Sequence, residues 1–137
     1  MKMNLEKEFF IEYGKVLYAL TSIDGEVQEI EKDSLLEEIK PELEPLEGAS
    51  ERNMVYYTLY PIESPEYAPR SRDDAINSFL QYLRKEDIHL SQEQTDALTR
   101  ALQVVAEAHD YVEPEEQHFI DLFDTKLSAA MEVERDK

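Results

Sequence analysis

Apolar residues recur at spacings of three and four along most of the chain, which is the period of a helix with one buried face. The first run covers residues 5–20, with Asn4 as its expected N-cap. A second run covers residues 28–40, and Pro41 is expected to end it because proline cannot continue a helix. The apolar stripe of the first run comprises Leu5, Phe9, Tyr13, Val16, Leu17 and Leu20.

Three later helices carry explicit start signals. Ser71 is an N-cap residue ahead of a run with two aspartates in its first turn. Ser91 is followed three residues later by Gln94, which is the spacing of a capping box. Pro114 suits the first position of the last helix. The pattern therefore predicts an all-α fold, a compact bundle of about five to seven helices in one domain over residues 1–137.

The middle of the chain has a different character. Residues 41–70 hold five of the six prolines and four of the eight tyrosines. Long regular structure is not expected there; a short helix begun near Ser50, or an irregular packed segment, fits better than a strand. The tyrosines either cover the core or form an exposed patch for a protein partner, and we favour the first interpretation. These tyrosines are Tyr56, Tyr57, Tyr60 and Tyr67.

The charge of the chain changes the list of expected partners. The 137 residues include 32 Asp and Glu against 14 Lys and Arg, which gives a formal net charge of −18. Such a surface repels nucleic acid and anionic membranes, so we expect neither as a partner. The chain has no cysteine and shows no apolar run typical of a signal peptide or a membrane span, and we predict a cytoplasmic protein.

Motifs for catalysis are missing from the sequence. There is no G-x-S-x-G elbow and no phosphate-binding loop, and the chain has three glycines. We therefore expect a protein that is not an enzyme.

An acidic turn between two helices occurs twice. The first is ALTSIDGEVQEIE at residues 19–31, and the second is AEAHDYVEPEE at residues 106–116. Aligned without a gap, residues 5–40 and 97–127 form a pseudo-repeat in which Glu31 meets Glu116. Carboxylates at a helix start are also favoured by the helix dipole and by unpaired backbone N–H groups, which is an alternative explanation without a ligand.

These paired acidic turns resemble those of TerB-like domains, the all-helical family of the tellurite-resistance protein TerB. A related domain occurs at the N-terminal side of the DnaJ-like co-chaperone DjlA. The resemblance covers roughly residues 5–40 and 72–127 and does not reach the Pro- and Tyr-rich middle. It implies a helical bundle associated with stress or tellurite resistance that binds a divalent cation, Ca²⁺ or Mg²⁺, with no established catalytic activity. Matched by position, the implied metal ligands are Asp24, Glu31, Asp110 and Glu116.

Other sites fit the sequence less well. An EF-hand that starts at Asp24 would need Gly at position six and Glu at position twelve, where the chain has Glu29 and Leu35. Glu115 and His118 have the spacing of a di-iron pair, but such a site needs a second pair and two more glutamates, so we favour a solvent-facing His118. The main alternative to a cation-binding protein is an interaction module, either a homodimer or the receptor of a basic partner.

Overall fold

The computed structural model describes residues 5–23, 32–47, 54–108 and 112–135. These residues form seven α-helices and two 3-10 helices, with no strand among the elements described, so the all-α prediction is confirmed. The elements are α1 (Lys7–Thr21), α2 (Lys32–Ile39), α3 (Glu44–Glu47), η2 (Met54–Leu59), α4 (Tyr60–Glu63), η3 (Pro65–Tyr67), α5 (Arg72–Lys85), α6 (Gln92–Glu107) and α7 (Pro114–Arg135).

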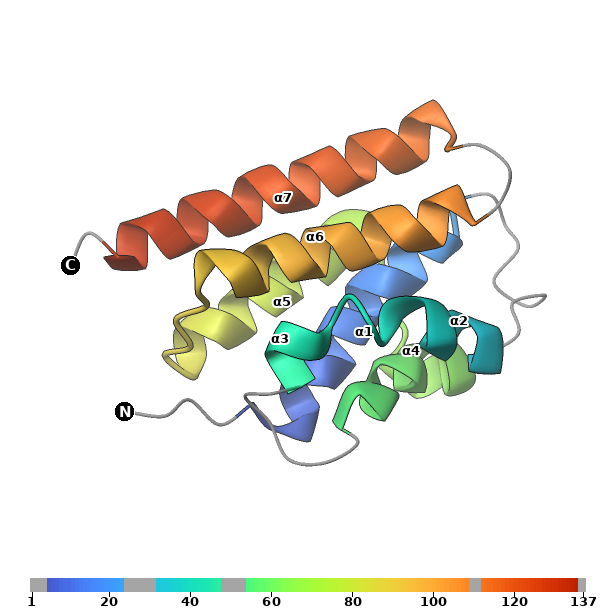
Figure 1. Cartoon of the computed structure of the whole chain (residues 1–137), viewed down its shortest axis with the longest axis horizontal. Helices are drawn as coiled ribbons and strands as arrows, with labels where there is room; N and C mark the ends of the chain where they lie inside the picture. The colour runs from blue at the N-terminus through green and yellow to red at the C-terminus, as the bar shows by residue number, and fades with distance from the viewer. Residues whose placement is uncertain (1–4, 24–31, 48–53, 109–111, 136–137) are drawn as a thin grey trace.

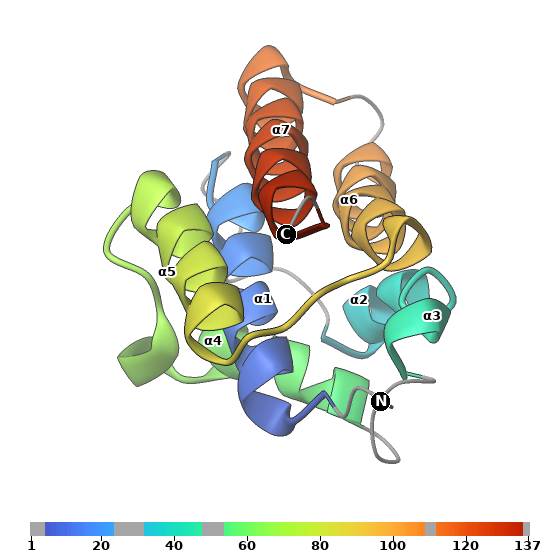
Figure 2. The same cartoon turned by 90° about the vertical axis from the view of Figure 1, so that its left-hand side faces the viewer.

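Helix α1 lies in the middle of the bundle. In Figure 2 it lies between α5, α7, α6 and α4, and it contacts all four as well as η2. Its sequence, KEFFIEYGKVLYALT, is apolar on most of its circumference, which is the property of a helix buried on several sides. The expected single stripe was therefore too narrow, because Phe10 and Ile11 are also buried.

The side chain of Tyr13 joins α1 to three other helices. The ring of Tyr13 lies 5.9 Å from that of Phe79 on α5 and 6.2 Å from that of Phe123 on α7. Its hydroxyl donates a hydrogen bond of 2.7 Å to the main-chain oxygen of Leu98 on α6. A buried tyrosine needs such a partner, since its O–H group would otherwise lose water without compensation.

Helices α6 and α7 run side by side as an antiparallel pair, and α2 and α3 pack against α6 (Figure 1). Polar side chains cross the α6–α7 contact as well as apolar ones. The hydroxyl of Thr99 donates to Asp124 at 2.9 Å, and the side-chain amides of Gln103 and Gln117 bond to each other. These contacts fix how α7 lies along α6.

Most predicted helix starts are confirmed. Ser71 accepts a hydrogen bond from the Asp74 N–H, Ser91 forms a full capping box with Gln94, and α7 begins at Pro114. The prediction of Asn4 as N-cap is wrong, because α1 begins at Lys7 and its N-cap position is Glu6.

The physical reason for the later start of α1 lies in the residue that precedes the cap. The cap at Glu6 puts Leu5 and Phe10 at the two positions of a hydrophobic staple, and both side chains are buried.

The described part of the Pro- and Tyr-rich middle contains four short helical segments, α3, η2, α4 and η3. This agrees with the expectation of a short helix, whose predicted start at Ser50 lies outside the described residues. Val55 and Leu59 are buried against α1, and Tyr57 is partly buried beside them. Tyr56 differs, because 47% of its surface is exposed. The segment thus covers the core mainly with aliphatic side chains.

Candidate functional site

The structure describes one of the four predicted metal ligands, Glu116. Asp24, Glu31 and Asp110 lie outside the described residues. Within the described ranges, no group of three or more His, Asp or Glu side chains is placed to hold a metal ion.

Glu116 forms part of the start of α7. The side chain is 4% exposed, and its Oε1 accepts a hydrogen bond of 3.0 Å from the backbone N–H of Glu113. This is the reciprocal half of a capping box, in which a glutamate at the third helical position satisfies the N-cap N–H. The helix-start explanation therefore accounts for one oxygen of this carboxylate.

The described residues that flank the two acidic turns lie around one cleft. Ser22 stands two residues before Asp24, and Pro114 stands four residues after Asp110. Both residues line the same opening, although they are far apart in sequence. The cleft therefore connects the C-terminal end of α1 with the N-terminal end of α7.

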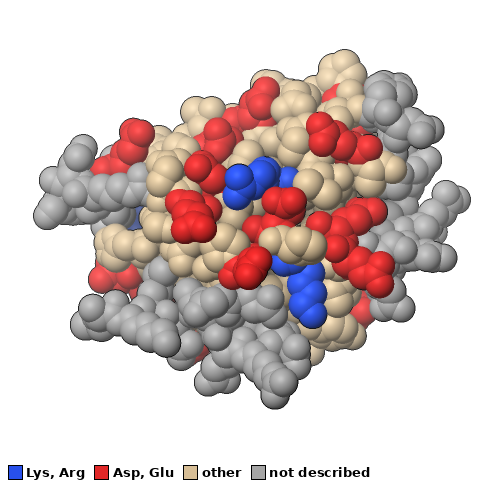
Figure 3. Space-filling model, viewed as in Figure 1, with Lys and Arg blue, Asp and Glu red and all other residues tan. Residues whose placement is uncertain are grey.

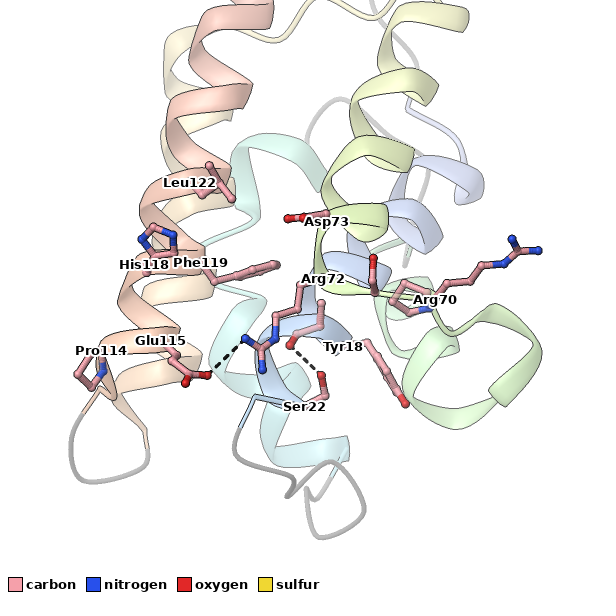
Figure 4. A pocket seen from close by; sticks show the side chains of 13 residues that line it. Tyr18, Ser22, Arg70, Arg72, Asp73, Pro114, Glu115, His118, Phe119 and Leu122 are labelled. Carbon is pink, nitrogen blue, oxygen red and sulfur yellow. Dashed lines mark hydrogen bonds and ion pairs between the residues drawn. The ribbon is translucent and has the colours of Figure 1, made fainter.

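The cleft has a volume of about 850 Å³ and lies between three helix ends (Figure 4). Helix α1 contributes its last turn, α5 its first turn with the preceding loop, and α7 its first two turns. Volumes of roughly 300–1,000 Å³ are typical of sites for small molecules. The size and the convergence of three elements make this cleft the candidate binding site.

One wall of the cleft is apolar. The ring of Phe119 points from α7 into the space between α7 and α5, and Leu122 follows one turn later on the same helix (Figure 4). Tyr18 and Ala19 complete this wall from α1. Phe119 is itself almost fully buried, whereas Tyr18 and Leu122 are partly exposed, so these two side chains form the apolar floor of the cleft.

Charged side chains of both signs stand at the rim. The Nη1 of Arg72 on α5 lies 3.4 Å from the Oε2 of Glu115 on α7, and this ion pair bridges the two helices (Figure 4). Asp73 points from α5 toward α7, whereas Arg70 points away from the cleft (Figure 4). Both members of the Arg72–Glu115 pair are exposed, so water screens it and it contributes little to stability.

His118 also lines the cleft and is exposed, as expected from the sequence. The Glu115–His118 pair therefore faces solvent near the rim.

A second surface feature is formed by tyrosines of the middle segment. The rings of Tyr57 and Tyr60 are 4.8 Å apart, and those of Tyr60 and Tyr67 are 5.8 Å apart. Tyr56 is the exposed large apolar side chain of this segment. The carboxylates of Glu63 and Glu66 on α4 and η3 are exposed in the same segment. Aromatic and acidic side chains thus occur together there.

Acidic side chains also spread over the face that includes α6 and α7, with small islands of Lys and Arg between them (Figure 3). Within the described residues, no helix has the length and the apolar content that crossing a bilayer requires.

Sequence reasoning missed the cleft. Its ion pair joins residues 43 positions apart, and neither Arg72 nor Phe119 carries a motif that marks a ligand. One weak signal was present, since Arg70 and Arg72 are two cations close together at a helix start that otherwise favours acidic residues. The TerB-like resemblance and its cation site stay predictions. No protein-family model, curated protein or solved structure matches this chain.

Proposed function

We propose that this chain is a non-enzymatic, TerB-like acidic protein of the cytoplasm that binds a divalent cation, Ca²⁺ or Mg²⁺, through Asp24, Glu31, Asp110 and Glu116. The proposal includes the association with stress or tellurite resistance that the resemblance implies. The observation that supports it is the position of Ser22 and Pro114 around one cleft, because these residues flank the two acidic turns.

The chemistry of the proposed ligands suits a hard cation. Ca²⁺ and Mg²⁺ take oxygen ligands, and all four side chains are carboxylates. Glu116 uses Oε1 to accept the Glu113 N–H, and within the described residues Oε2 accepts no hydrogen bond, so this second oxygen is available to an ion. The net charge of −18 also raises the local concentration of cations around the whole molecule.

Thermal unfolding with and without divalent ions tests the proposal. At about 100 times its dissociation constant, a specifically bound ion adds about 2.7 kcal/mol to the free energy of unfolding. In a domain of this size the melting temperature then rises by roughly 5 to 10 °C. The reference is monovalent salt of equal ionic strength, which screens the negative charges without occupying a site.

Paired variants separate a site from general screening. The double variant Glu31→Gln/Glu116→Gln removes two proposed ligands. We expect the extra rise in melting temperature caused by divalent ions, the divalent increment, to disappear, while the rise caused by monovalent salt persists. The control Glu37→Gln/Glu38→Gln removes two carboxylates of α2 that are outside both acidic turns in the sequence, and it should keep the divalent increment. If the first double variant retains the whole divalent increment, the cation site does not exist.

A second candidate function is protein binding through Tyr56, Tyr57, Tyr60 and Tyr67. The observation that favours it is the 47% exposure of Tyr56 beside a cluster of three tyrosine rings. The partner is a second copy of the chain or a basic protein. Light scattering over a range of concentrations tests the homodimer, and Tyr56→Ser together with Tyr60→Ser should abolish any dimer. If the protein is a monomer at all concentrations, the homodimer is excluded and the basic partner remains. Capture on a lysine-rich peptide column tests that alternative.

A further inference from the structure

The cleft between α1, α5 and α7 carries side chains of both charges above an apolar floor, and this combination defines the chemistry of a ligand. We propose that the cleft binds a small zwitterion with an apolar body, of which a short peptide with free termini is the simplest example. Its carboxylate would bind Arg72, its ammonium group would bind Asp73, and its apolar side chains would lie on Tyr18 and Leu122. This proposal concerns the same cleft but uses none of the four predicted metal ligands.

The guanidinium of Arg72 is available for a ligand. Its described ion pair, to Glu115, is 3.4 Å long, whereas charge-assisted N–H···O bonds are about 2.7–2.9 Å. Arginine has five N–H donors and can bind a carboxylate with two of them at once. The carboxylate of Glu115 therefore marks where a ligand carboxylate would lie. The exposed and weak Arg72–Glu115 pair would be replaced by a closer pair between Arg72 and the ligand.

Asp73 supplies the opposite charge. Its side chain points from α5 toward α7 (Figure 4), and it makes no hydrogen bond or ion pair within the described residues. The neighbouring Asp74 lies in the same first helical turn but does not line the cleft. A cation bound at Asp73 would share the cleft with an anion bound at Arg72, because both residues line it.

The floor and the volume set the size of the ligand. Tyr18 and Leu122 are partly exposed and line the cleft, so they offer an apolar surface to side chains, and burying such surface contributes roughly 25 cal/mol per Å². The volume of about 850 Å³ exceeds the needs of a single amino acid and suits a peptide of a few residues.

The test is an NMR titration of the ¹⁵N-labelled protein with three forms of one dipeptide, Leu-Phe. The forms are the free dipeptide, the N-acetylated dipeptide, which lacks the ammonium group, and the dipeptide amide, which lacks the carboxylate. We expect the free dipeptide to shift the amide signals of Arg72, Asp73 and Phe119. Each capped form should bind at least about tenfold more weakly, since each loses one charge-assisted contact.

This panel distinguishes the cleft from simple attraction to an acidic protein. With a net charge of −18, general electrostatics would favour the dipeptide amide, which carries only a positive charge. The proposal is therefore overturned if the amide binds as well as the free dipeptide or better. It is also overturned if no form shifts the cleft signals, or if the shifts lie on other elements.

Matched variants assign the two contacts. Arg72→Gln should lower affinity for the free dipeptide to that of the amide, and Asp73→Asn should lower it to that of the N-acetylated form. The controls are Arg100→Gln, which breaks an ion pair with Glu42, and Asp74→Asn; none of these three residues lines the cleft. Both controls should bind like the wild type. Equal weakening by Arg72→Gln and Arg100→Gln would refute the site, because it would show an effect of total charge. Circular dichroism of each variant confirms that the fold is kept.

Discussion

The main-chain oxygen of Thr58 approaches Gly14 so closely that a β-carbon on Gly14 would overlap it. Gly14 lies on the face of α1 that packs against η2, and the ring of Pro61 on α4 is also near. The obstacle on η2 is backbone, which cannot move aside as a flexible side chain would. The absence of a side chain on Gly14 therefore sets the distance between α1 and the middle segment.

Gly14→Ala should destabilise the protein. Alanine is the better helix former by about 1 kcal/mol, but overpacking in a core typically costs about 1–3 kcal/mol, and here the clash is with backbone. We expect the free energy of unfolding to fall by about 1–2 kcal/mol in urea denaturation. An increase of about 1 kcal/mol would show instead that η2 shifts away from α1 without cost.

Glu116→Ala should cost about 1 kcal/mol, because the Glu113 N–H loses the acceptor that caps α7. Glu116→Gln keeps an oxygen at the same place, so it should cost less, and relief of charge repulsion could offset the rest. Chemical denaturation of the two variants without divalent ions is the measurement. Equal stability of the alanine and glutamine variants would contradict a capping role.

Tyr82 should make stability fall at alkaline pH. Burial, aided by Glu86, raises the pKa of Tyr82 from 10.0 to about 12 in the folded protein. Between these values the unfolded chain has lost a proton that the folded protein keeps, so the free energy of unfolding falls as pH rises. Burial also raises the pKa of Tyr13, which adds to this loss.

We expect Tyr82→Phe to lose less stability than the wild type between pH 10 and pH 12, measured by urea denaturation. Tyr56→Phe is the matched control, since this ring is exposed in the folded protein, and it should behave like the wild type. Parallel pH profiles for wild type and Tyr82→Phe would exclude a contribution from Tyr82.

Monovalent salt should stabilise the protein. The charge of −18 on 137 residues creates repulsion that is stronger in the compact state than in the unfolded chain. Raising the ionic strength from about 0.01 M to about 0.1 M shortens the Debye length from roughly 30 Å to about 10 Å. We expect the melting temperature to rise by several degrees over this range. An unchanged melting temperature would mean that the charges are already balanced by local pairs.

Local signals in the sequence were sufficient for the helices but not for the cleft. Ser71, Ser91 and Pro114 act within one helical turn, so each could be assigned from its neighbours, and the structure confirms all three. The prediction of Asn4 as the N-cap of α1 failed because burial of Leu5, a tertiary effect, outweighs the capping preference of asparagine. The Arg72–Glu115 pair depends on how α5 and α7 converge, which no local pattern contains.

The burial of α1 among its later partners has a consequence for synthesis. The hydroxyl of Tyr13 bonds to Leu98, 85 residues further along, and Phe123 is later still. At about 5–20 residues per second, a nascent chain carries α1 for roughly 4 to 17 seconds before Leu98 is made. During that time α1 can pack against η2 and α5 as they are made, but it lacks its contacts with α6 and α7. We therefore expect ribosome-bound fragments that end before α7 to bind chaperones and to be cleaved readily by proteases, whereas the released chain resists both.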